Sequence, residues 1–446
     1  MTATTGRRST AKVSPRKVAV ASFVGTAIEW YDFFIFGTAA ALVFGTQFFP
    51  TLNPLAATLA AFATFGVAFF ARPLGAVVFG HYGDRIGRKK MLVLSLLLMG
   101  GSTVLVGLVP NYEQIGIAAP LLLVLLRLLQ GFAVGGEWGG AVLMAVEHAP
   151  QHKRAFYGSF PQAGVPAGLV LATTAFLLVG LLPEEAAMSW GWRIPFIASA
   201  ALVAIGLYVR FSLTESPEFE ETQSSKKLTR MPIAEVLRSH RAPLAVGIFT
   251  QATSLVPFYL VTVFVLSYGP ETLNVPRQMI LLALLIACIL DIFSVPYASA
   301  VADRIGPRKM LIWGAAYMAV VAYPFFFLLS LGTFASVCAA MILIVTVGHA
   351  VTYSAVAAYA SGLFPAEVRY TGASVAYQMG GVLFSAPAPF IAVAITASIG
   401  SQAVGQLALA GYIAAACVIS ILALTIPAAA KLRHWRRIAT EDLGRA

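Results

Sequence analysis

Two segments of this sequence, GDRIGRKKML at residues 83–92 and ADRIGPRKML at residues 302–311, align residue for residue. Each follows the second long apolar run of its half of the chain, and each separates that run from the next. Self-similarity at so large a separation indicates an internal duplication. The repeat therefore predicts a molecule built from two related halves.

The composition is that of a membrane protein. Of the 446 residues, 59% are hydrophobic and only 11% are charged, whereas soluble domains carry about 25% charged residues. Apolar runs of about 20 residues, the length that a helix needs to cross a bilayer, recur from Val18 to Ala430. Because backbone groups in lipid must be satisfied internally, these long runs predict helices rather than β-barrel strands.

We predict an all-α membrane protein with two pseudo-symmetric six-helix bundles. The twelve helices are expected at residues 18–48, 55–80, 91–110, 117–147, 155–182, 193–213, 243–268, 278–301, 310–331, 335–363, 371–398 and 405–430. The predicted domains are a tail at 1–17, a first bundle at 18–213, a linker at 214–242, a second bundle at 243–430 and a tail at 431–446. The hydrophilic linker is expected to contain one short amphipathic helix.

Basic residues gather in alternate loops. The formal net charge is +11, and 26 of the 30 Lys and Arg residues fall in the tails, in residues 210–241 or in every second loop. This is the positive-inside pattern, which predicts a multi-pass protein of the plasma (inner) membrane with both termini in the cytoplasm. Because the positive charge is spread thinly along the chain, it does not favour a nucleic-acid partner.

Signals for metals, cofactors and enzymatic chemistry are weak. The three cysteines, Cys288, Cys338 and Cys417, lie singly in apolar runs. His148 and His152 have the spacing of a metal pair, but Pro150 lies between them and disfavours a continuous helix. The sequence contains no nucleophile elbow, P-loop or zincin motif. We therefore expect neither a metal site nor an enzyme.

Two carboxylates lie within the first apolar run, in the stretch TAIEWYDFFIFG at residues 26–37. Glu29 and Asp32 are three residues apart and share one helix face. A charge in hydrocarbon costs roughly 2.5–3.5 kcal/mol even on lenient scales, so two such charges require a reason. Two close carboxylates also resist double ionisation, so we expect one of them to hold a proton. The alternative is that each braces the bundle by pairing with a neighbouring helix, and which member titrates stays open.

Further ionisable residues lie in other apolar runs of the first half. Arg127 and Gln130 share a face of the fourth helix, where the guanidinium needs a carboxylate, a carbonyl or an anionic ligand. Glu137 is about 15 Å further along that helix, too far for a direct pair, and it is equally compatible with a proton site and an interhelical bond. We expect Arg72 to snorkel to the headgroups and Arg193 to anchor at the far interface.

The second half contains fewer candidates. Asp291 lies near Pro296, where backbone carbonyls are freed, and His349 is able to titrate near neutrality or to serve in packing. We predict proton-coupling roles for Glu29, Asp32, Arg127, Glu137 and Asp291. The side chains expected to line a substrate site are Tyr31, Arg127, Gln130, Gln162, Gln251, Tyr259, His349, Tyr353 and Gln378.

Several motifs resemble those of a known family. GHYGDRIGRKK (80–90) and the Arg127–Gly131 segment of RLLQGFAVGGEWGG (127–140) are similar to motifs of the major facilitator superfamily. EWYDFFIFG (29–37), RPLGAVVFG (72–80), EHAPQHKRAFYGSFPQAG (147–164) and WGWRIPF (190–196) resemble its metabolite:H+ symporter family. That family includes carriers for shikimate, α-ketoglutarate, citrate and proline/betaine, and the resemblance covers nearly the whole chain. It also links Arg127 with proton transfer.

The two repeated loops are expected to act as gates at the cytoplasmic face. Their glycines permit tight turns, and their charged groups can form bonds that exist in one conformation and break in the other. The predicted gate residues are Gly83, Asp84, Arg85, Gly87, Arg88, Asp303, Arg304 and Gly306.

These observations favour a proton-coupled symporter that imports a small organic acid or related metabolite by alternating access. The two-half design is associated with carriers that bind substrate between the halves. The proton is the expected coupling ion, no other cofactor is expected, and the protein is expected to work as a monomer in the lipid bilayer. The alternatives are uptake of a zwitterionic osmolyte, a drug:H+ antiporter, and, from a different class, a channel or transport-silent sensor.

Overall fold

Twelve helices that are long and apolar enough to cross a membrane are found in the described part of the chain, as predicted. The structure, a computed structural model, describes residues 15–211 and 232–425. Some side chains inside these ranges, including those of Asp84, Arg88 and Arg277, lie outside the description. The predicted tails and most of the predicted linker therefore fall largely or wholly outside the described residues.

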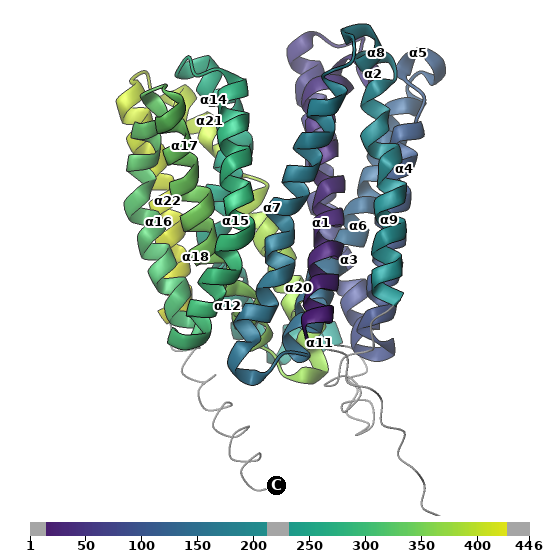
Figure 1. Cartoon of the computed structure of the whole chain (residues 1–446). Coiled ribbons are helices and arrows are strands. Elements are labelled where there is room, and N and C mark those ends of the chain that lie inside the picture. The colour runs from purple at the N-terminus through teal and green to yellow at the C-terminus, as the bar shows by residue number, and fades with distance from the viewer. Residues whose placement is uncertain (1–14, 212–231, 426–446) are drawn as a thin grey trace, which may run out of the picture.

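The first six spanning helices lie together on one side of the molecule (Figure 1). The first is α1 (Pro15–Ala39), which continues through the π-helical segment η1 (Ala40–Phe44) into α2 (Gly45–Phe48). The others are α3 (Pro54–Ile86), α4 (Arg88–Leu108), α6 (Ala118–Glu147), α7 (Arg154–Val179) and α9 (Ile194–Phe211). Short helices α5 (Tyr112–Ile115) and α8 (Glu184–Ser189) lie in the connections, as do the 3-10 turns η2 (Gln151–Lys153) and η3 (Gly191–Arg193).

The second set of six lies beside the first and is more often interrupted. Its first member consists of α12 (Arg241–Phe249), α13 (Ala252–Tyr259), η4 (Leu260–Phe264) and α14 (Val265–Thr272). Then come α15 (Arg277–Ile305) and α16 (Pro307–Ser330), followed by the run α17 (Phe334–Met341), η5 (Ile342–His349), α18 (Ala350–Tyr353) and α19 (Val356–Ser361). The turn η6 (Ala366–Val368) leads to α20 (Arg369–Gly380), η7 (Gly381–Ser385), α21 (Ala388–Ser398) and finally α22 (Gln402–Thr425).

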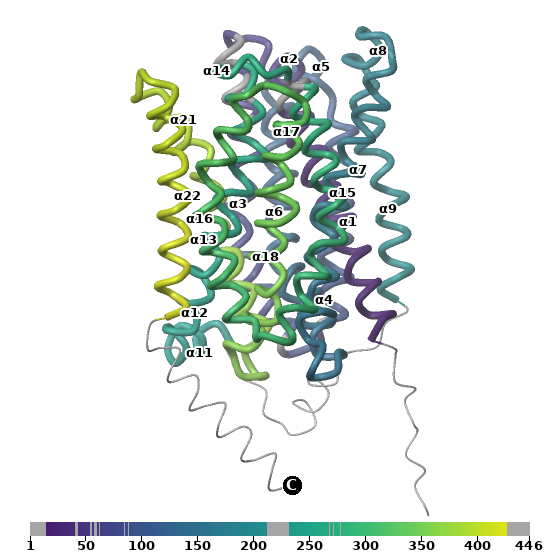
Figure 2. The backbone as a smooth tube through the Cα atoms, turned by 60° about the vertical axis from the view of Figure 1, so that its left-hand side comes forward, coloured from purple at the N-terminus to yellow at the C-terminus, as the bar shows by residue number. Residues whose placement is uncertain are grey.

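Both described ends of the chain lie at one end of the molecule, which we call the tail end; the opposite end is the far end (Figures 1 and 2). The short helix α11 (Pro232–Ser239), part of the predicted amphipathic linker, also lies at the tail end and packs against α3 and α20. The two halves pack together through α7 against α15 and α3 against α20. These four helices therefore form much of the boundary between the halves.

The repeated segments are more helical than the predicted loops. Helices α3 and α15 continue through them to Ile86 and Ile305, so the predicted ends at residues 80 and 301 are too early. The turn to the next helix is made at a single glycine in each case, Gly87 with φ 113° and Gly306 with φ 94°. Glycine adopts this region without a steric penalty, which confirms the tight turns expected from the sequence.

Helices α3 and α6 pack backbone against backbone. A Cβ added at Gly75 would collide with the Phe132 carbonyl of α6, and one added at Gly135 would collide with the Arg72 carbonyl of α3. Glycine lets helices approach this closely, and in lipid such packing is a main source of helix association. The contact also fixes Arg72 on α3 beside the middle of α6.

The close approach predicts that Gly135→Ala destabilises the fold, because its new methyl group meets backbone atoms rather than a movable side chain. The matched control is Gly66→Ala on α3, where a Cβ would meet nothing within 4 Å and alanine favours the helix by up to about 1 kcal/mol. Thermal unfolding of the purified protein in detergent should show a lower Tm for Gly135→Ala and an equal or higher Tm for Gly66→Ala. Equal Tm values for the two variants would contradict the packing argument.

Candidate functional site

Four ionisable side chains are buried together in the first half. Glu29, Asp32, Arg72 and Arg127 are each at most 5% exposed and line one cavity. Its remaining lining residues are Phe33, Ala68, Met99, Gln130, Gly131 and Val134. The cavity measures about 10 Å³, about the space that the centre of one water molecule requires. Glu29 lies 14 residues from the start of α1, or about 21 Å along its axis, so the cluster is near the middle of the bundle.

Arg127 is held by aromatic rings and one amide. Its guanidinium carbon lies 4.1 Å from the centroid of the Phe36 ring and about 5 Å from those of Phe33 and Phe65. Arg127 Nη1 donates to Gln130 Oε1 at 3.0 Å, and Gln130 in turn donates to the Thr103 hydroxyl at 2.8 Å. Cation–π contacts stabilise a desolvated guanidinium by about 2 kcal/mol or more. Arg127 Nε and Nη2 have no hydrogen-bond partner among the described residues.

The two carboxylates differ in their surroundings. Asp32 Oδ1 accepts a 2.5 Å hydrogen bond from the Ser199 hydroxyl of α9. Asp32 Oδ2 and Glu29 Oε2 are buried without a partner among the described residues. No ion pair within 4.0 Å joins either acid to Arg72 or Arg127, all four of which are described. Glu29, Asp32, Arg72 and Arg127 therefore line one cavity, and each has at least one buried polar atom without a hydrogen-bond partner among the described residues.

Arg72 does not reach the headgroups, and that expectation is wrong. Its guanidinium carbon lies 4.4 Å from the centroid of the Phe69 ring and 4.7 Å from that of Phe33, and its Nε has no hydrogen-bond partner among the described residues. The Tyr259 hydroxyl, which belongs to the second half, is within hydrogen-bond reach of Arg72. The error follows from the early end assigned to this helix. With α3 ending at Ile86, Arg72 lies 14 residues, or about 21 Å, inside the bundle.

Glu137 belongs to a separate network within the first half. It forms an ion pair with Arg210 of α9 and accepts a 2.5 Å hydrogen bond from the Ser95 hydroxyl of α4. Arg210 also donates to the Leu92 carbonyl. This geometry favours the interhelical bond over the proton site, the two roles that the sequence left open. Arg210 is in the last turn of α9, yet its side chain points into the bundle and is buried.

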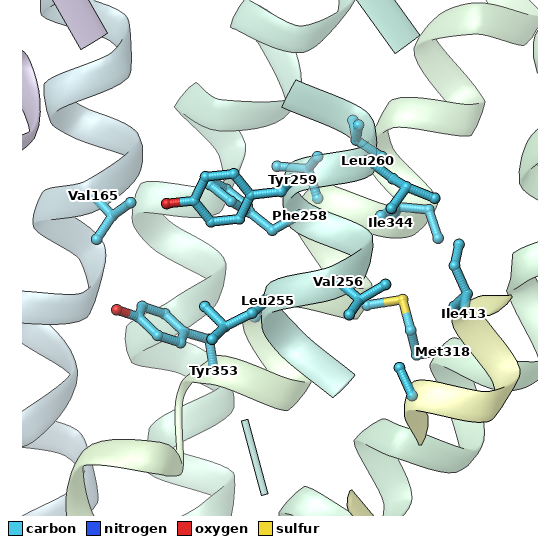
Figure 3. Packing of buried hydrophobic residues seen from close by; sticks show 14 of the residues in the cluster. Val165, Leu255, Val256, Phe258, Tyr259, Leu260, Met318, Ile344, Tyr353 and Ile413 are labelled. Atoms are coloured by element: carbon cyan, nitrogen blue, oxygen red, sulfur yellow. The ribbon is translucent and has the colours of Figure 1, made fainter. Parts of the chain in front are cut away.

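Aromatic rings and amides join the halves near the middle of the molecule. The Trp138 ring of α6 stacks on Tyr377 of α20 with centroids 3.9 Å apart and planes 4° apart. Trp138 Nε1 donates to Gln162 Oε1 at 2.8 Å, and Gln162 Nε2 donates to the Tyr353 carbonyl at 3.2 Å. The Tyr353 and Tyr377 hydroxyls are 2.7 Å apart. In Figure 3 the hydroxyls of Tyr259 and Tyr353 point from the second half towards Val165 of α7.

The other predicted substrate-site residues have different positions. Tyr31 donates to the Pro195 carbonyl at 2.8 Å within the first half. Gln251 Nε2 donates to the Gly247 and Ala376 carbonyls. Gln378 crosses the boundary, because its Nε2 donates to the Gly135 carbonyl of α6 at 3.2 Å. Gln162, Tyr353 and Gln378, which the sequence predicts to line a substrate site, lie at the boundary between the halves. The sequence analysis did not single out Trp138 and Tyr377, although Trp138 follows the glycines and acid of GGEWGG.

Asp291 and His349, separate candidates in the sequence, are partners in the structure. His349 Nδ1 lies 2.8 Å from Asp291 Oδ2, and Ser294 donates to Asp291 Oδ1 at 3.0 Å. The His349 ring stacks between Phe258 and Tyr353, with centroid distances of 4.8 and 4.7 Å. His349 ends the π-helical segment η5, and such segments occur often at functional sites.

Polar contacts also join the halves at the tail end. Asp303 accepts hydrogen bonds of 2.8 and 2.9 Å from the backbone N–H groups of Ala155 and Phe156, which begin α7. A carboxylate at a helix N-terminus is favoured by the unpaired N–H groups and by the helix dipole. Arg369 pairs with Glu147 at 3.2 Å, and Tyr370 donates to the Gly136 carbonyl at 2.7 Å.

The other predicted gate residues are less engaged or lie outside the description. A Cβ at Gly83 would collide with the Tyr370 ring of α20. This glycine lies inside α3 and permits close packing against α20, and it does not form a turn. Arg85 is exposed and lies 3.2 Å from His81, and Arg304 is exposed. The side chains of Asp84 and Arg88 lie outside the described residues.

Arg193 is tied to the neighbouring helix rather than only to the interface. Its Nη1 donates to the Gly107 and Val109 carbonyls at the end of α4, at 2.9 and 2.7 Å. Its guanidinium carbon lies 4.3 Å from the centroid of the Trp192 ring, which is fully buried. Arg193 therefore satisfies the last carbonyls of α4.

Twelve spanning helices in two halves, with buried charges at their centre and polar contacts between the halves, define a membrane transporter. The sequence profile of the Major Facilitator Superfamily matches residues 22–389, and this chain belongs to that family. It is accordingly a multi-pass membrane transporter for small molecules and not an enzyme, as expected from the sequence.

Relatives match nearly the whole chain. The inner membrane metabolite transport protein YhjE of Escherichia coli is 46% identical over 93% of this chain and 94% of its own length. The shikimate transporter of the same organism is 41% identical over 91% and 93%. The glycine betaine/proline/ectoine/pipecolic acid transporter OusA of Dickeya dadantii is 34% identical over 84% and 77%. The solved proton:xylose symporter XylE shares the fold, with a TM-score of 0.73 over 93% and 95% of the chains at 16% identity.

The Asp303 cap predicts a weaker tail-end closure in Asp303→Ala. Spin labels at Lys90 and Lys309, exposed residues of the two halves, report the distance across this end in a background without native cysteines. The variant should shift the distribution towards longer distances, because the N–H groups that begin α7 lose their acceptor. Glu113→Ala, at an exposed acid of the far end, is the control. Identical distributions for Asp303→Ala and the control would remove Asp303 from the gate.

Proposed function

We propose that this chain is a proton-coupled symporter that imports a small organic acid by alternating access. The observation that carries the proposal is the buried cavity with two carboxylates and two guanidiniums, none of which is closed into an ion pair with another. In a low-dielectric interior a change in the charge of one such group strongly alters the energy of the others. Binding of a proton or of an anion changes the total charge of such a cluster, so both ligands alter its energy.

Coupling requires that both ligands discriminate between two conformations. The contacts at the tail end supply an element with two states, because the Asp303 cap and the Arg369–Glu147 pair must break if that end is to open. The positive-inside pattern supports a cytoplasmic tail end in an inner membrane. On this orientation the structure is closed towards the cytoplasm. We propose that binding of proton and anion favours the opposite, inward-open state of a monomeric carrier.

The relatives support an organic acid more than a zwitterion. The chain is 41% identical to the shikimate transporter but 34% and 32% identical to transporters of the proline/betaine type. Uptake of a zwitterionic osmolyte is the second candidate, and the two are separated by the substrates that the protein accumulates. No feature of the described site favours a drug antiporter or a channel.

Uptake into proteoliposomes tests the proposal. Purified protein should accumulate radiolabelled shikimate when the lumen is made alkaline, and a protonophore should abolish the accumulation. Betaine accumulation in place of shikimate would favour the second candidate. Saturable shikimate flux that ignores the pH gradient would remove proton coupling.

Replacement of the cavity residues should abolish coupled uptake without loss of folded protein. Asp32→Asn and Arg127→Gln are expected to reduce shikimate accumulation at least tenfold, because the loss of one charge from the buried cluster changes the energy of the charged groups that remain. Glu184→Gln, at an exposed acid, is the control. Folding is checked by size-exclusion chromatography and Tm. Normal accumulation by both cavity variants would place the coupling elsewhere.

A further inference from the structure

We propose that the Glu29 carboxylate and the carboxylate of the substrate are alternative partners of one guanidinium, that of Arg72. The transporter then carries one proton with one monocarboxylate and moves no net charge. This inference rests on the proposed symport function and deepens it, since it assigns the coupling acid, the substrate anchor and the stoichiometry.

The net charge of the cavity depends on whether its two acids are ionised. With both acids ionised, Glu29 and Asp32 balance Arg72 and Arg127, and the four groups sum to zero. When one acid takes up a proton, one guanidinium is left uncompensated. A buried net charge is unfavourable in a medium of low dielectric constant. One carboxylate from outside restores neutrality, so proton and monoanion bind as a pair.

One guanidinium must lose its balancing charge when an acid takes up a proton. Arg210 is committed to its ion pair with Glu137. Arg127 is enclosed by three phenylalanine rings and donates to Gln130. Arg127 Nε and Nη2 have no hydrogen-bond partner among the described residues, but the three rings hold this side chain within the first half. Arg72 forms no ion pair with a described residue, and the Phe69 ring that it contacts has its centroid 5.9 Å from that of Tyr259 in the second half. Of these three guanidiniums, Arg72 is therefore the one that lies next to the second half without an ion pair.

One of the two acids must take up the proton that leaves Arg72 uncompensated. Asp32 is attached to α9 through the Ser199 hydroxyl, and its carboxylate lies in the field of Arg127. Glu29 accepts no hydrogen bond from the described residues, and it lines one cavity with Arg72, which acts on it electrostatically. We therefore assign Arg72 as the group that balances the charge of Glu29. Protonation of Glu29 leaves that guanidinium uncompensated, while Asp32 keeps its hydrogen bond from Ser199.

The remaining ionisable groups that face Glu29 keep their protonation states in this scheme. Arginine stays protonated and buried tyrosine hydroxyls stay neutral at working pH. From its own and the surrounding helices these groups are Asp32 (α1), Arg72 (α3), Arg127 and Glu137 (α6), Arg210 (α9), Tyr259 (α13), Tyr353 (α18) and Tyr377 (α20).

The position of Arg72 links its ligand to both halves. The Tyr259 hydroxyl lies within reach of Arg72 and of Ser385 in η7, and the Phe69 and Tyr259 rings are 5.9 Å apart. An anion bound to Arg72 therefore lies against the second half, and its contacts change when the halves move relative to one another. In the closed state described here the cavity has room for about one water, so the anion enters when the halves separate at the far end.

The same surroundings define the class of substrate. One guanidinium is available, which suits one carboxylate bound by two parallel N–H···O bonds. The walls beside it are the aromatic rings of Phe33, Phe69 and Tyr259, which suit a compact ring or an apolar body. A second carboxylate would meet Arg127 behind three phenylalanine rings and Arg210 already paired with Glu137. Monocarboxylates are therefore preferred over di- and tricarboxylates.

Separate gradients test the stoichiometry in proteoliposomes with radiolabelled shikimate, benzoate, succinate and citrate. With the membrane potential clamped at zero, a gradient of one pH unit should drive about tenfold accumulation of shikimate or benzoate, the limit for one proton per substrate. A potassium diffusion potential without a pH gradient should drive none. Accumulation driven by an interior-negative potential, or transport of succinate or citrate in preference to both monocarboxylates, overturns the proposal. Failure to transport any of the four instead counts against the proposed symport function.

Variants test the assignment of residues. Glu29→Gln should lose accumulation driven by the pH gradient but retain shikimate exchange between the two sides, because Arg72 is permanently free. Arg72→Gln should lose both activities at least 30-fold, the lower bound expected for truncating one side of a buried charge pair. Arg72→Lys, which keeps the charge but not the planar fork, should lose exchange about tenfold and serves if Arg72→Gln is not recovered folded.

Arg193→Gln is the matched control, since Arg193 lies at the far end of α4 and outside the cavity. It should accumulate shikimate as the unmodified protein does. Accumulation by Glu29→Gln against a pH gradient removes Glu29 as the coupling acid. Exchange by Arg72→Gln or Arg72→Lys within threefold of the unmodified protein removes Arg72 as the anchor.

Discussion

The structure depends on holding four charged groups in the middle of a bundle where water is scarce. A guanidinium or carboxylate in such surroundings is stable only with a partner of opposite charge, a hydrogen bond or an aromatic face. The first half supplies all three kinds: rings around Arg127, a hydroxyl for Asp32, and opposite charge within the cavity. The arrangement is stable while its total charge is balanced, and this condition gives a bundle of otherwise apolar helices a response to protons and anions.

Backbone packing makes that arrangement possible. Because α3 and α6 touch through Gly75, Gly131 and Gly135, Arg72 and Arg127 line one cavity although they belong to different helices. A second set of contacts, among Trp138, Gln162, Tyr353 and Tyr377, joins the halves next to that cavity. All the residues that line the cavity belong to the first half, and the Phe69 ring beside Arg72 contacts the Tyr259 ring of the second half. A change in the charge of the cluster therefore affects the contacts between the halves.

Much of this architecture could be predicted from the sequence. The apolar runs gave twelve helices, and the repeated DRIG segments gave the duplication, because both depend on local patterns. The grouping of Glu29 with Asp32 and of Arg127 with Gln130 follows from helical spacing alone. The pairing of Arg210 with Glu137, of Asp291 with His349 and of Trp138 with Tyr377 could not be derived. Each of these pairs joins residues from different helices, and a single sequence does not specify how helices are rotated against one another.

Arg72 illustrates how a small local error changes a functional interpretation. A helix end placed six residues too early moved this side chain from the middle of the bundle to its edge, where snorkelling is the ordinary fate of an arginine. Burial among Phe33, Phe69 and Tyr259 then went unrecognised.

The single-glycine junctions at Gly87 and Gly306 have a mechanical consequence. With one residue between α3 and α4, and one between α15 and α16, neither pair of helices has slack to slide independently. A movement of α3 or α15 along its axis therefore displaces the first residues of α4 or α16, so that the two helices of each pair move together at the tail end.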